Sequence, residues 1–272
     1  MSFAALHHQD LPLVLPNAWD VPSALAFLDA GYPAIGTTSM GVASSLGRPD
    51  GDRATRNANS ALAARLSSLA CYLSIDIEDG YSDDPDEVAD YVRALDVDGI
   101  NIEDSTGEKL IATHRHAAKI AAIKRAAPGV FVNARVDTYW LGQDDTAPAT
   151  LARAVSYVEA GADGVFVPGA SDPGLLRSIT AALSVPVNVL AIPGLSLPEL
   201  ADLGIRRVST GSLPYRAALA AAVEVARAVT GGRPVPGATP YSDLQARLVR
   251  YAGTEWDRRP GRGVSEEIRR SP

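Results

Sequence analysis

The strongest constraint on the fold of this 272-residue chain is an alternation between short β-rich runs and alanine-rich helical patterns. The first run, Leu11–Asn17, leads into a helical segment that ends at Gly31, and the second run, Tyr32–Ser39, follows at once. Repetition of this alternation gives eight β–α pairs. Apolar parallel strands with intervening helices are typical of an α/β (β/α)8 TIM barrel, which we therefore predict. An open doubly wound sheet is the alternative, although no G-x-G-x-x-G motif follows the first run.

The later part of the chain continues the same pattern. A polar, glycine-containing loop is expected at Met40–Arg56, before the helix that precedes the third strand. Six further strands are predicted at Tyr72–Glu78, Asp98–Asp104, Gly129–Asp137, Ala162–Gly169, Val185–Gly194 and Arg206–Gly211.

Two domains are expected, with the boundary near residue 230. Residues 1–230 carry the barrel, and residues 231–272 carry a linker, a C-terminal helix and a tail. The Gly/Pro-rich segment Gly231–Pro240 is the linker, and Tyr241–Gly253 has the pattern of an extra amphipathic helix. From Glu255 onward we expect a solvated, mobile tail.

Composition excludes several classes of function. Hydrophobic residues make up 46% of the chain and charged residues 21%, which fits a buried core. The net charge of −7 and the lack of a basic stripe argue against nucleic acid or an anionic membrane as a partner. A single cysteine, no apolar run of about 18 residues and no signal-peptide pattern predict a cytoplasmic protein.

The distribution of reactive side chains narrows the chemistry further. A Schiff-base enzyme needs a lysine inside the barrel, but Lys109, Lys119 and Lys124 all fall in or beside one helix. A zinc site usually needs histidine or cysteine, and no histidine lies at a predicted strand end. Cys71 lies at the start of the third strand, which is the wrong end of a barrel for a nucleophile.

Carboxylates do collect at the strand ends, where barrel active sites lie. Asp76 and Glu78 are two positions apart and should share one face of a strand, and Glu103 has a matching place on the next strand. Converging carboxylates repel one another unless a cation lies between them, and an oxygen-only set suits Mg²⁺, with Mn²⁺ as the alternative. Arg135 would supply a cationic fork for a substrate carboxylate or phosphonate. The other interpretation is a structural ion network at the barrel mouth.

Five segments, in this order and spacing, resemble one known family. They are "GTTSMGVASSLGRPD", "SIDIEDGYSD", "GINIED", "VNARVD" and "EAGADGVFVPG". The chain resembles the isocitrate lyase/phosphoenolpyruvate mutase superfamily over roughly Leu11–Val229. The resemblance implies a barrel that binds Mg²⁺ and a small 2-oxo acid or its enolate.

The resemblance also assigns roles to the strand-end residues. It implies that Asp76 is the first of three carboxylates at the metal site and that Glu103 is the third. Glu78 stands where the family has its second aspartate and has a longer side chain. The resemblance implies that Arg135 grips the substrate, so Arg135 and Glu103 are candidate catalytic residues. Asn133, at the same strand end as Arg135, is a further candidate substrate contact.

The segment after the second strand corresponds to the family's gating loop. Family members carry a Ser-Gly pair there that holds the carboxylate of the oxo acid; this chain has Thr38, Ser39 and Met40. The resemblance implies that these three residues bind substrate, as Asp76 does. It also implies that Asp50 is a catalytic aspartate of the loop, whereas its ordinary interpretation is a turn carboxylate.

Departures from the family narrow the activity. The Cys-Gly-His segment of the isocitrate-type lyases is absent, and Ser105 replaces the lysine that follows Glu-Asp in the mutases. We therefore expect a Mg²⁺-dependent lyase- or hydrolase-type enzyme that cleaves a C–C or C–P bond of a small 2-oxo acid, such as an oxaloacetate-like substrate. The alternatives are a non-catalytic binder of 2-oxo acids and a carboxyphosphonoenolpyruvate-type phosphonomutase.

The last predicted barrel helix is unusually rich in small and apolar residues, "AALAAAVEVARAV". In the family that the chain resembles, this helix is commonly exchanged with a neighbouring subunit. The resemblance therefore implies a helix-swapped homo-oligomer, a dimer or a tetramer.

Overall fold

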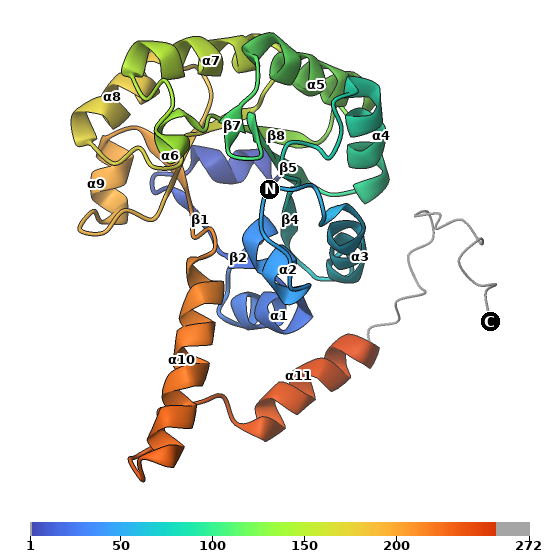
Figure 1. Cartoon of the computed structure of the whole chain (residues 1–272), viewed down its shortest axis with the longest axis vertical. Coiled ribbons are helices and arrows are strands. Elements are labelled where there is room, and N and C mark those ends of the chain that lie inside the picture. The colour runs from blue at the N-terminus through green and yellow to red at the C-terminus, as the bar shows by residue number, and fades with distance from the viewer. Residues whose placement is uncertain (1, 254–272) are drawn as a thin grey trace, which may run out of the picture. The chain divides into compact units, whose positions relative to one another are not determined.

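A ring of parallel strands forms the centre of the computed structural model, which describes residues 2–253 (Figure 1). The strands are β1 (Leu13–Leu15), β2 (Asn17–Ala18), β3 (Ala34–Thr37), β4 (Tyr72–Asp76), β5 (Gly99–Glu103), β8 (Phe131–Arg135), β9 (Gly164–Phe166), β10 (Val187–Leu190) and β11 (Ile205–Ser209). Their order is β1-β11-β10-β9-β8-β5-β4-β3-β2.

The first strand closes the ring in two pieces. β1 pairs with β11, and β2 pairs with β3. Pro16 lies between the two pieces and has no backbone N–H, so it interrupts the hydrogen-bond ladder there. Eight strands with intervening helices therefore form a nearly closed parallel barrel. The predicted TIM-barrel fold is confirmed.

Helices follow the strands in the order that the alternation predicts. They are η1 (Ala4–His8), α1 (Val21–Asp29), α2 (Ser39–Ser45), α3 (Arg56–Leu66), α4 (Pro85–Leu95), α5 (Thr113–Ala126), α6 (Thr138–Leu141), α7 (Ala147–Glu159), α8 (Pro173–Ala182), α9 (Leu197–Asp202), α10 (Leu213–Thr230) and α11 (Tyr241–Gly253).

The segment that we expected as a loop, Met40–Arg56, begins with α2. The glycine content of this segment suggested a loop, but the Thr38 side chain caps the helix by accepting a hydrogen bond from the backbone N–H of Gly41 at 3.4 Å. The remainder, from Leu46 to Thr55, connects α2 to α3 and is called the gating segment below.

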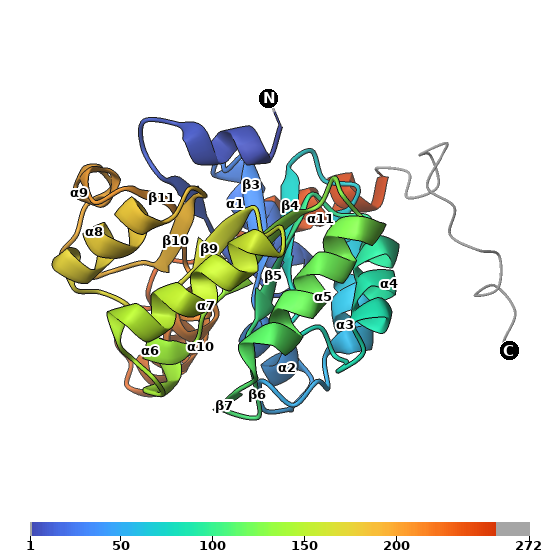
Figure 2. The same ribbon diagram turned by 90° about the horizontal axis from the view of Figure 1, so that it is seen from above.

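The two ends of the barrel differ. At the amino ends of the strands, Phe3, which precedes η1, and Leu6 of η1 form a small apolar cluster with Leu13, Leu15 and Phe131. Figure 2 shows η1 at one end of the barrel and the hairpin of β6 (Ser105–Thr106) and β7 (Lys109–Leu110) at the other. Because η1 covers the amino end, the opposite end is the one that remains open for a site.

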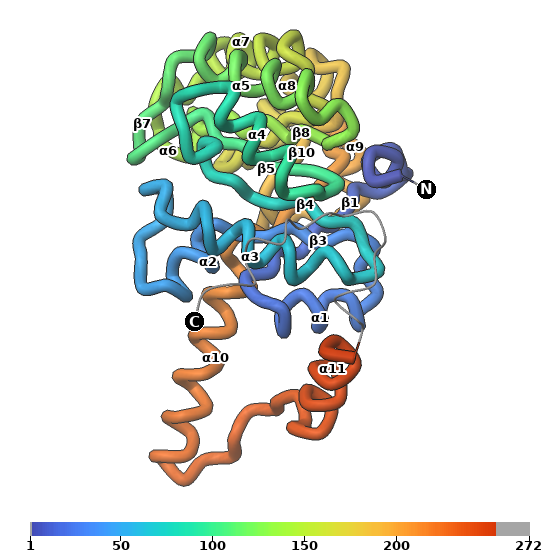
Figure 3. The backbone as a smooth tube through the Cα atoms, turned by 90° about the vertical axis from the view of Figure 1, so that its right-hand side faces the viewer, coloured from blue at the N-terminus to red at the C-terminus, as the bar shows by residue number. Residues whose placement is uncertain are grey.

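The chain divides into two compact units at residues 235/236. The first unit contains the barrel and α10. Most side chains of α10 are exposed, and the helix extends away from the strands in Figure 3. The second unit contains α11, with the bounds that its amphipathic pattern predicts. The predicted mobile tail lies outside the described residues. Among residues 2–253, no helix is long and apolar enough to cross a lipid bilayer.

Candidate active site

A cavity of about 400 Å³ lies at the carboxyl ends of the strands. Seven strands each place their last residue in its lining: Thr37, Asp76, Glu103, Arg135, Phe166, Leu190 and Ser209. This is the end of a TIM barrel at which active sites are found.

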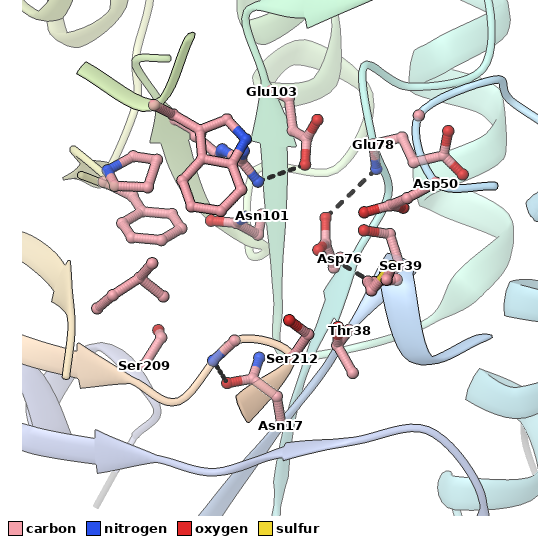
Figure 4. Close-up of a pocket in the computed structure, with 18 of the residues that line it drawn as sticks. Asn17, Thr38, Ser39, Asp50, Asp76, Glu78, Asn101, Glu103, Ser209 and Ser212 are labelled. Atoms are coloured by element: carbon pink, nitrogen blue, oxygen red, sulfur yellow. Dashed lines mark hydrogen bonds and ion pairs between the residues drawn. The ribbon is translucent and has the colours of Figure 1, made fainter. Parts of the chain in front are cut away.

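Most of the residues that the sequence singled out meet in this cavity (Figure 4). Its lining includes Thr38, Ser39, Met40, Asp50, Asp76, Glu78, Glu103 and Arg135. Asn133 is different: it is buried and is not among the lining residues. Its side-chain amide donates a hydrogen bond at 2.9 Å to Asn101, which does line the cavity. The structure therefore places Asn133 behind the candidate substrate contacts.

Arg135 is held by two carboxylates. It faces Glu103 across the β5–β8 pairing, and its Nη1 donates to Glu103 while its Nε donates to Asp137. The rings of Trp140 and Phe166 lie 5.5 and 5.7 Å from the guanidinium carbon. Burial raises the pKa of Glu103, and the charge of Arg135 opposes that rise. The result is a fixed cation with a fixed orientation in the cavity wall.

Asp76 is a carboxylate of the cavity wall that has only weak hydrogen-bond partners. Its oxygens accept hydrogen bonds from the backbone N–H groups of Ser39 and Glu78, both at the long distance of 3.4 Å. Desolvation raises the pKa of Asp76, Arg135 lowers it, and the negative charge of Asp50 raises it again. Asp50 itself is exposed at the cavity mouth. Asp76 therefore has unused acceptor capacity beside other carboxylates, which favours a cation.

We expected Glu78 to lie on the same strand as Asp76, but it does not. β4 ends at Asp76, and Glu78 has a positive φ of 50° in the turn that follows. One carboxylate oxygen of Glu78 accepts a hydrogen bond from the hydroxyl of Thr55, and the other accepts one from the backbone N–H of Arg53 at 2.9 Å. The strand-face argument fails because the backbone turns before this residue. The longer side chain of glutamate binds the gating segment.

Asp79 also binds the gating segment, through Arg53. It is buried and accepts hydrogen bonds from the guanidinium of Arg53, from the hydroxyl of Thr106 at 2.6 Å and from the ammonium of Lys119 at 3.3 Å. Burial alone would raise the pKa of Asp79, but the hydrogen bonds from Arg53 and Thr106 and the Lys119 charge bring it below its ordinary value. Lys119 is thereby a structural ion-pair partner.

The donor set fits Mg²⁺ as an ion with few direct protein ligands. Within residues 2–253, no three or more His, Cys, Asp or Glu side chains are grouped closely enough to hold a metal ion together. Mg²⁺ commonly keeps several waters and takes one or two carboxylates. Asp76 offers such a carboxylate, and the negative charge of Asp50 acts on it. Asp76 and Asp50 both act on Glu103 as well. Both side-chain oxygens of Glu78 already accept hydrogen bonds from the gating segment.

The cysteine and the helix histidines, which the sequence analysis did not place at the carboxyl end of a strand, are not among the residues that line the cavity. Cys71 precedes β4 at the amino end, and burial raises its pKa to about 11. His114 is exposed on α5, whereas His116 on the same helix is fully buried against the ring of Tyr157. The helix turns His116 towards α7, which carries Tyr157.

Sequence reasoning missed a buried arginine of the lining, Arg207 on β11. Its neighbour Arg206 is half-exposed, whereas Arg207 is buried and lies two positions before Ser209. The signal was present in the predicted strand Arg206–Gly211, because residues two apart on a strand share a face and Arg207 therefore lies on the same face as Ser209.

The comparisons with known proteins agree with this architecture. The family model described as phosphoenolpyruvate phosphomutase matches residues 3–230. An uncharacterized protein of Mycobacterium tuberculosis is 62% identical over 251 residues, which is 92% of this chain and 97% of that protein. The 2-methylisocitrate lyase of Bacillus subtilis is 28% identical over 228 residues, which is 76% of this chain and 73% of that enzyme.

Solved structures have the same fold. A protein from Burkholderia cenocepacia J2315 has a TM-score of 0.82 and 34% identity, covering 91% of this chain and 94% of that one. A phosphonopyruvate hydrolase solved with oxalate and Mg²⁺ has a TM-score of 0.79 and 23% identity, covering 93% of this chain and 98% of that one. The family match over most of the chain and the barrel with its carboxylate-lined mouth lead to one conclusion: this chain belongs to the phosphoenolpyruvate mutase/isocitrate lyase superfamily.

Proposed function

We propose that this protein is a Mg²⁺-dependent enzyme of the lyase or hydrolase type that acts on a small 2-oxo acid. One observation carries the proposal: Asp76 and the Arg135–Glu103 ion pair line the same cavity. A carboxylate that can bind a cation and a guanidinium of fixed orientation therefore face one space large enough for a small substrate. The hydrolase relative solved with oxalate and Mg²⁺ supports the choice of ligand and ion.

The chain's own residues would position the substrate. The guanidinium of Arg135 would bind an acidic group of the 2-oxo acid, and Glu103 and Asp137 hold that guanidinium in place. Thr38, Ser39 and Met40 also line the cavity, and the hydroxyl groups of Thr38 and Ser39 would supply polar contacts to its carboxylate. Asp50, at the mouth, would exchange a proton between the substrate and solvent.

The reaction that fits these groups breaks the bond between C3 of the 2-oxo acid and its substituent. In oxaloacetate the C3–C4 bond breaks, its electron pair moves towards the C2 oxygen, CO2 leaves, and C3 then takes a proton to give pyruvate. A bound Mg²⁺ would supply positive charge close to the C2 oxygen. Asp76 would hold the ion, with Glu103 and Glu78 acting at longer range.

A turnover assay with matched variants tests the proposal. Purified protein with Mg²⁺ would be incubated with two β-substituted 2-oxo acids, oxaloacetate and phosphonopyruvate, and with the hydroxy acid 2-methylisocitrate for comparison. The variants Glu103→Gln and Asp76→Asn would be assayed beside the wild type. We expect turnover of at least one β-substituted 2-oxo acid, and a loss of about 100-fold or more in both variants.

Two other outcomes would change the assignment. Tight binding of a 2-oxo acid without conversion of any substrate would assign a non-catalytic binder. Rearrangement of phosphonopyruvate to phosphoenolpyruvate without release of phosphate would assign a phosphonomutase.

A further inference from the structure

A buried arginine without a carboxylate partner lies in the cavity wall. Arg207 is 2% exposed and lines the cavity. Its Nε donates a hydrogen bond at 3.3 Å to the hydroxyl of Ser209, but its Nη1 is buried with no hydrogen-bond partner. Among the described residues, Arg207 forms no ion pair. An unpaired buried charge is costly to a fold, so a role in ligand binding is a reason to retain it.

The charge of this arginine is present at neutral pH. Desolvation lowers the pKa of Arg207 to about 9, with Asp76 as the charged group that opposes the shift. The other buried arginine of the cavity, Arg135, already shares its charge with Glu103 and Asp137. Arg216 also lines the cavity but is exposed, so water screens its charge. Among the described residues, Arg207 is therefore a buried arginine of the lining that forms no ion pair with a carboxylate.

The topology places Arg207 far from the Glu103 side. β11 and β5 are opposite one another, because β10, β9 and β8 separate them in one direction and the first strand, β3 and β4 in the other. Figure 4 shows Ser209 and Asn17 on one side of the cavity and Glu103 on the other. A ligand held near Asp76 and Arg135 would therefore extend its far end towards β11.

We propose that Arg207 binds a second anionic group of the substrate, a carboxylate or a phosphonate, and so selects 2-oxo acids that carry such a group over simple 2-oxo acids. This inference rests on the proposed function, since it adds a second contact to the same site. Arg207 is then a specificity-determining residue: its free N–H groups meet a negative charge only when the substrate is long enough to reach β11. The hydroxyl of Ser209, which donates to Asn188 at 3.2 Å, helps to hold the guanidinium.

Calorimetry in the presence of Mg²⁺ tests the assignment with four probes. Oxalate and 3,3-difluoropyruvate fill only the 2-oxo acid end, 3,3-difluorooxaloacetate adds a distal carboxylate, and phosphonopyruvate adds a phosphonate. The wild-type protein should bind at least one of the two longer probes about tenfold or more tightly than 3,3-difluoropyruvate. Which of them binds more tightly distinguishes the carboxylate from the phosphonate.

Variants at two neighbouring arginines isolate the effect. Arg207→Met should abolish the preference for the longer probes and leave the Kd of oxalate and of 3,3-difluoropyruvate within about threefold. Arg207→Lys should keep part of the preference, because the charge remains but the planar fork is lost. The control Arg206→Met, on the other face of β11, should keep all of it. Thermal unfolding should show Arg207→Met to be at least as stable as the wild type, because an unpaired buried charge has been removed.

The outcomes separate this inference from the proposed function. If the wild type binds oxalate with Mg²⁺ but Arg207→Met binds the longer probes as tightly as the wild type does, the role of Arg207 is refuted and the proposed function stands. Equal weakening of all four probes in Arg207→Met and Arg207→Lys would also refute the role, because it indicates a structural contribution. If the wild type binds no probe, both proposals fail.

Discussion

The carboxylate of Glu78 accepts a hydrogen bond from the hydroxyl of Thr55, and this contact ties the end of the gating segment to the floor of the cavity. The same carboxylate accepts the backbone N–H of Arg53. An aspartate at this position would be one methylene shorter. The contact thus gives a physical role to the longer side chain at the place where the superfamily pattern has aspartate.

Shortening that side chain should loosen the gating segment. In Glu78→Asp we expect about tenfold lower kcat/KM and faster hydrogen exchange over residues 46–55, because a charge-assisted hydrogen bond is worth about 1.5–3 kcal/mol. Glu78→Gln keeps the length and should fall between Glu78→Asp and the wild type. Unchanged exchange over this segment in Glu78→Asp would contradict the role.

Asp76 should be the residue on which metal affinity depends. Asp76→Asn keeps the shape of the side chain but removes its charge, so we expect at least tenfold weaker Mn²⁺ binding, measured by electron paramagnetic resonance titration. Asp83→Asn, at an exposed carboxylate outside the cavity lining, serves as the control and should bind Mn²⁺ as the wild type does. Equal affinities in both variants would remove Asp76 from the metal site.

Removal of the buried charge of Asp79 should destabilise the fold. Asp79→Asn leaves the ammonium of Lys119, 2% exposed, without its anionic partner, and this should cost about 3 kcal/mol in the free energy of unfolding. Asp83 also binds Arg53 but is 80% exposed, so Asp83→Asn should cost less than about 1 kcal/mol. Urea denaturation of the two variants measures the difference, and similar losses would be the contrary result.

His116 should make the protein sensitive to acid. Burial lowers its pKa from 6.5 to about 3, and both ring nitrogens are buried without hydrogen-bond partners. Between these values the unfolded chain binds a proton that the folded chain does not, so His116 makes stability fall as the pH drops from about 6.5 to about 3. Urea midpoints at pH 8 and pH 5 should therefore differ less in His116→Leu than in the wild type. His114→Gln, at an exposed site on the same helix, should keep the wild-type difference.

The exposed apolar side chains of α10 should mediate self-association. Leu219 and Val223 lie one turn apart and are 52% and 50% exposed. We expect a homo-oligomer by light scattering at micromolar concentration, and a shift to monomer in Val223→Glu. Ala221→Glu, on the opposite side of the helix, should shift the equilibrium less. A monomeric wild type would contradict the predicted exchange of this helix.

The order of residues along the chain was enough to predict the barrel and the end at which the cavity lies. The alternation of β-rich and helical segments is local, and it leaves few ways to bury so many apolar strands. Asp76, Glu103 and Arg135 are the last residues of their strands, so the direction of a parallel strand was enough to place them together. The lack of a lysine, histidine or cysteine at those strand ends argued against Schiff-base, zinc and thiol chemistry, and this stays a prediction.

The contacts of those side chains depend on how the elements are arranged in three dimensions, which the pattern of residues does not report. The backbone turns after Asp76, so Glu78 reaches the gating segment, and no periodicity reports such a turn. Asn133 lies behind Asn101 because the depth of a residue in a barrel depends on the stagger between strands. Arg207 and Asp79 are both buried charges, yet one has no ion-pair partner among the described residues and the other contacts Arg53 and Lys119. Those partners come from elements far apart in the chain, which only the closed barrel brings together.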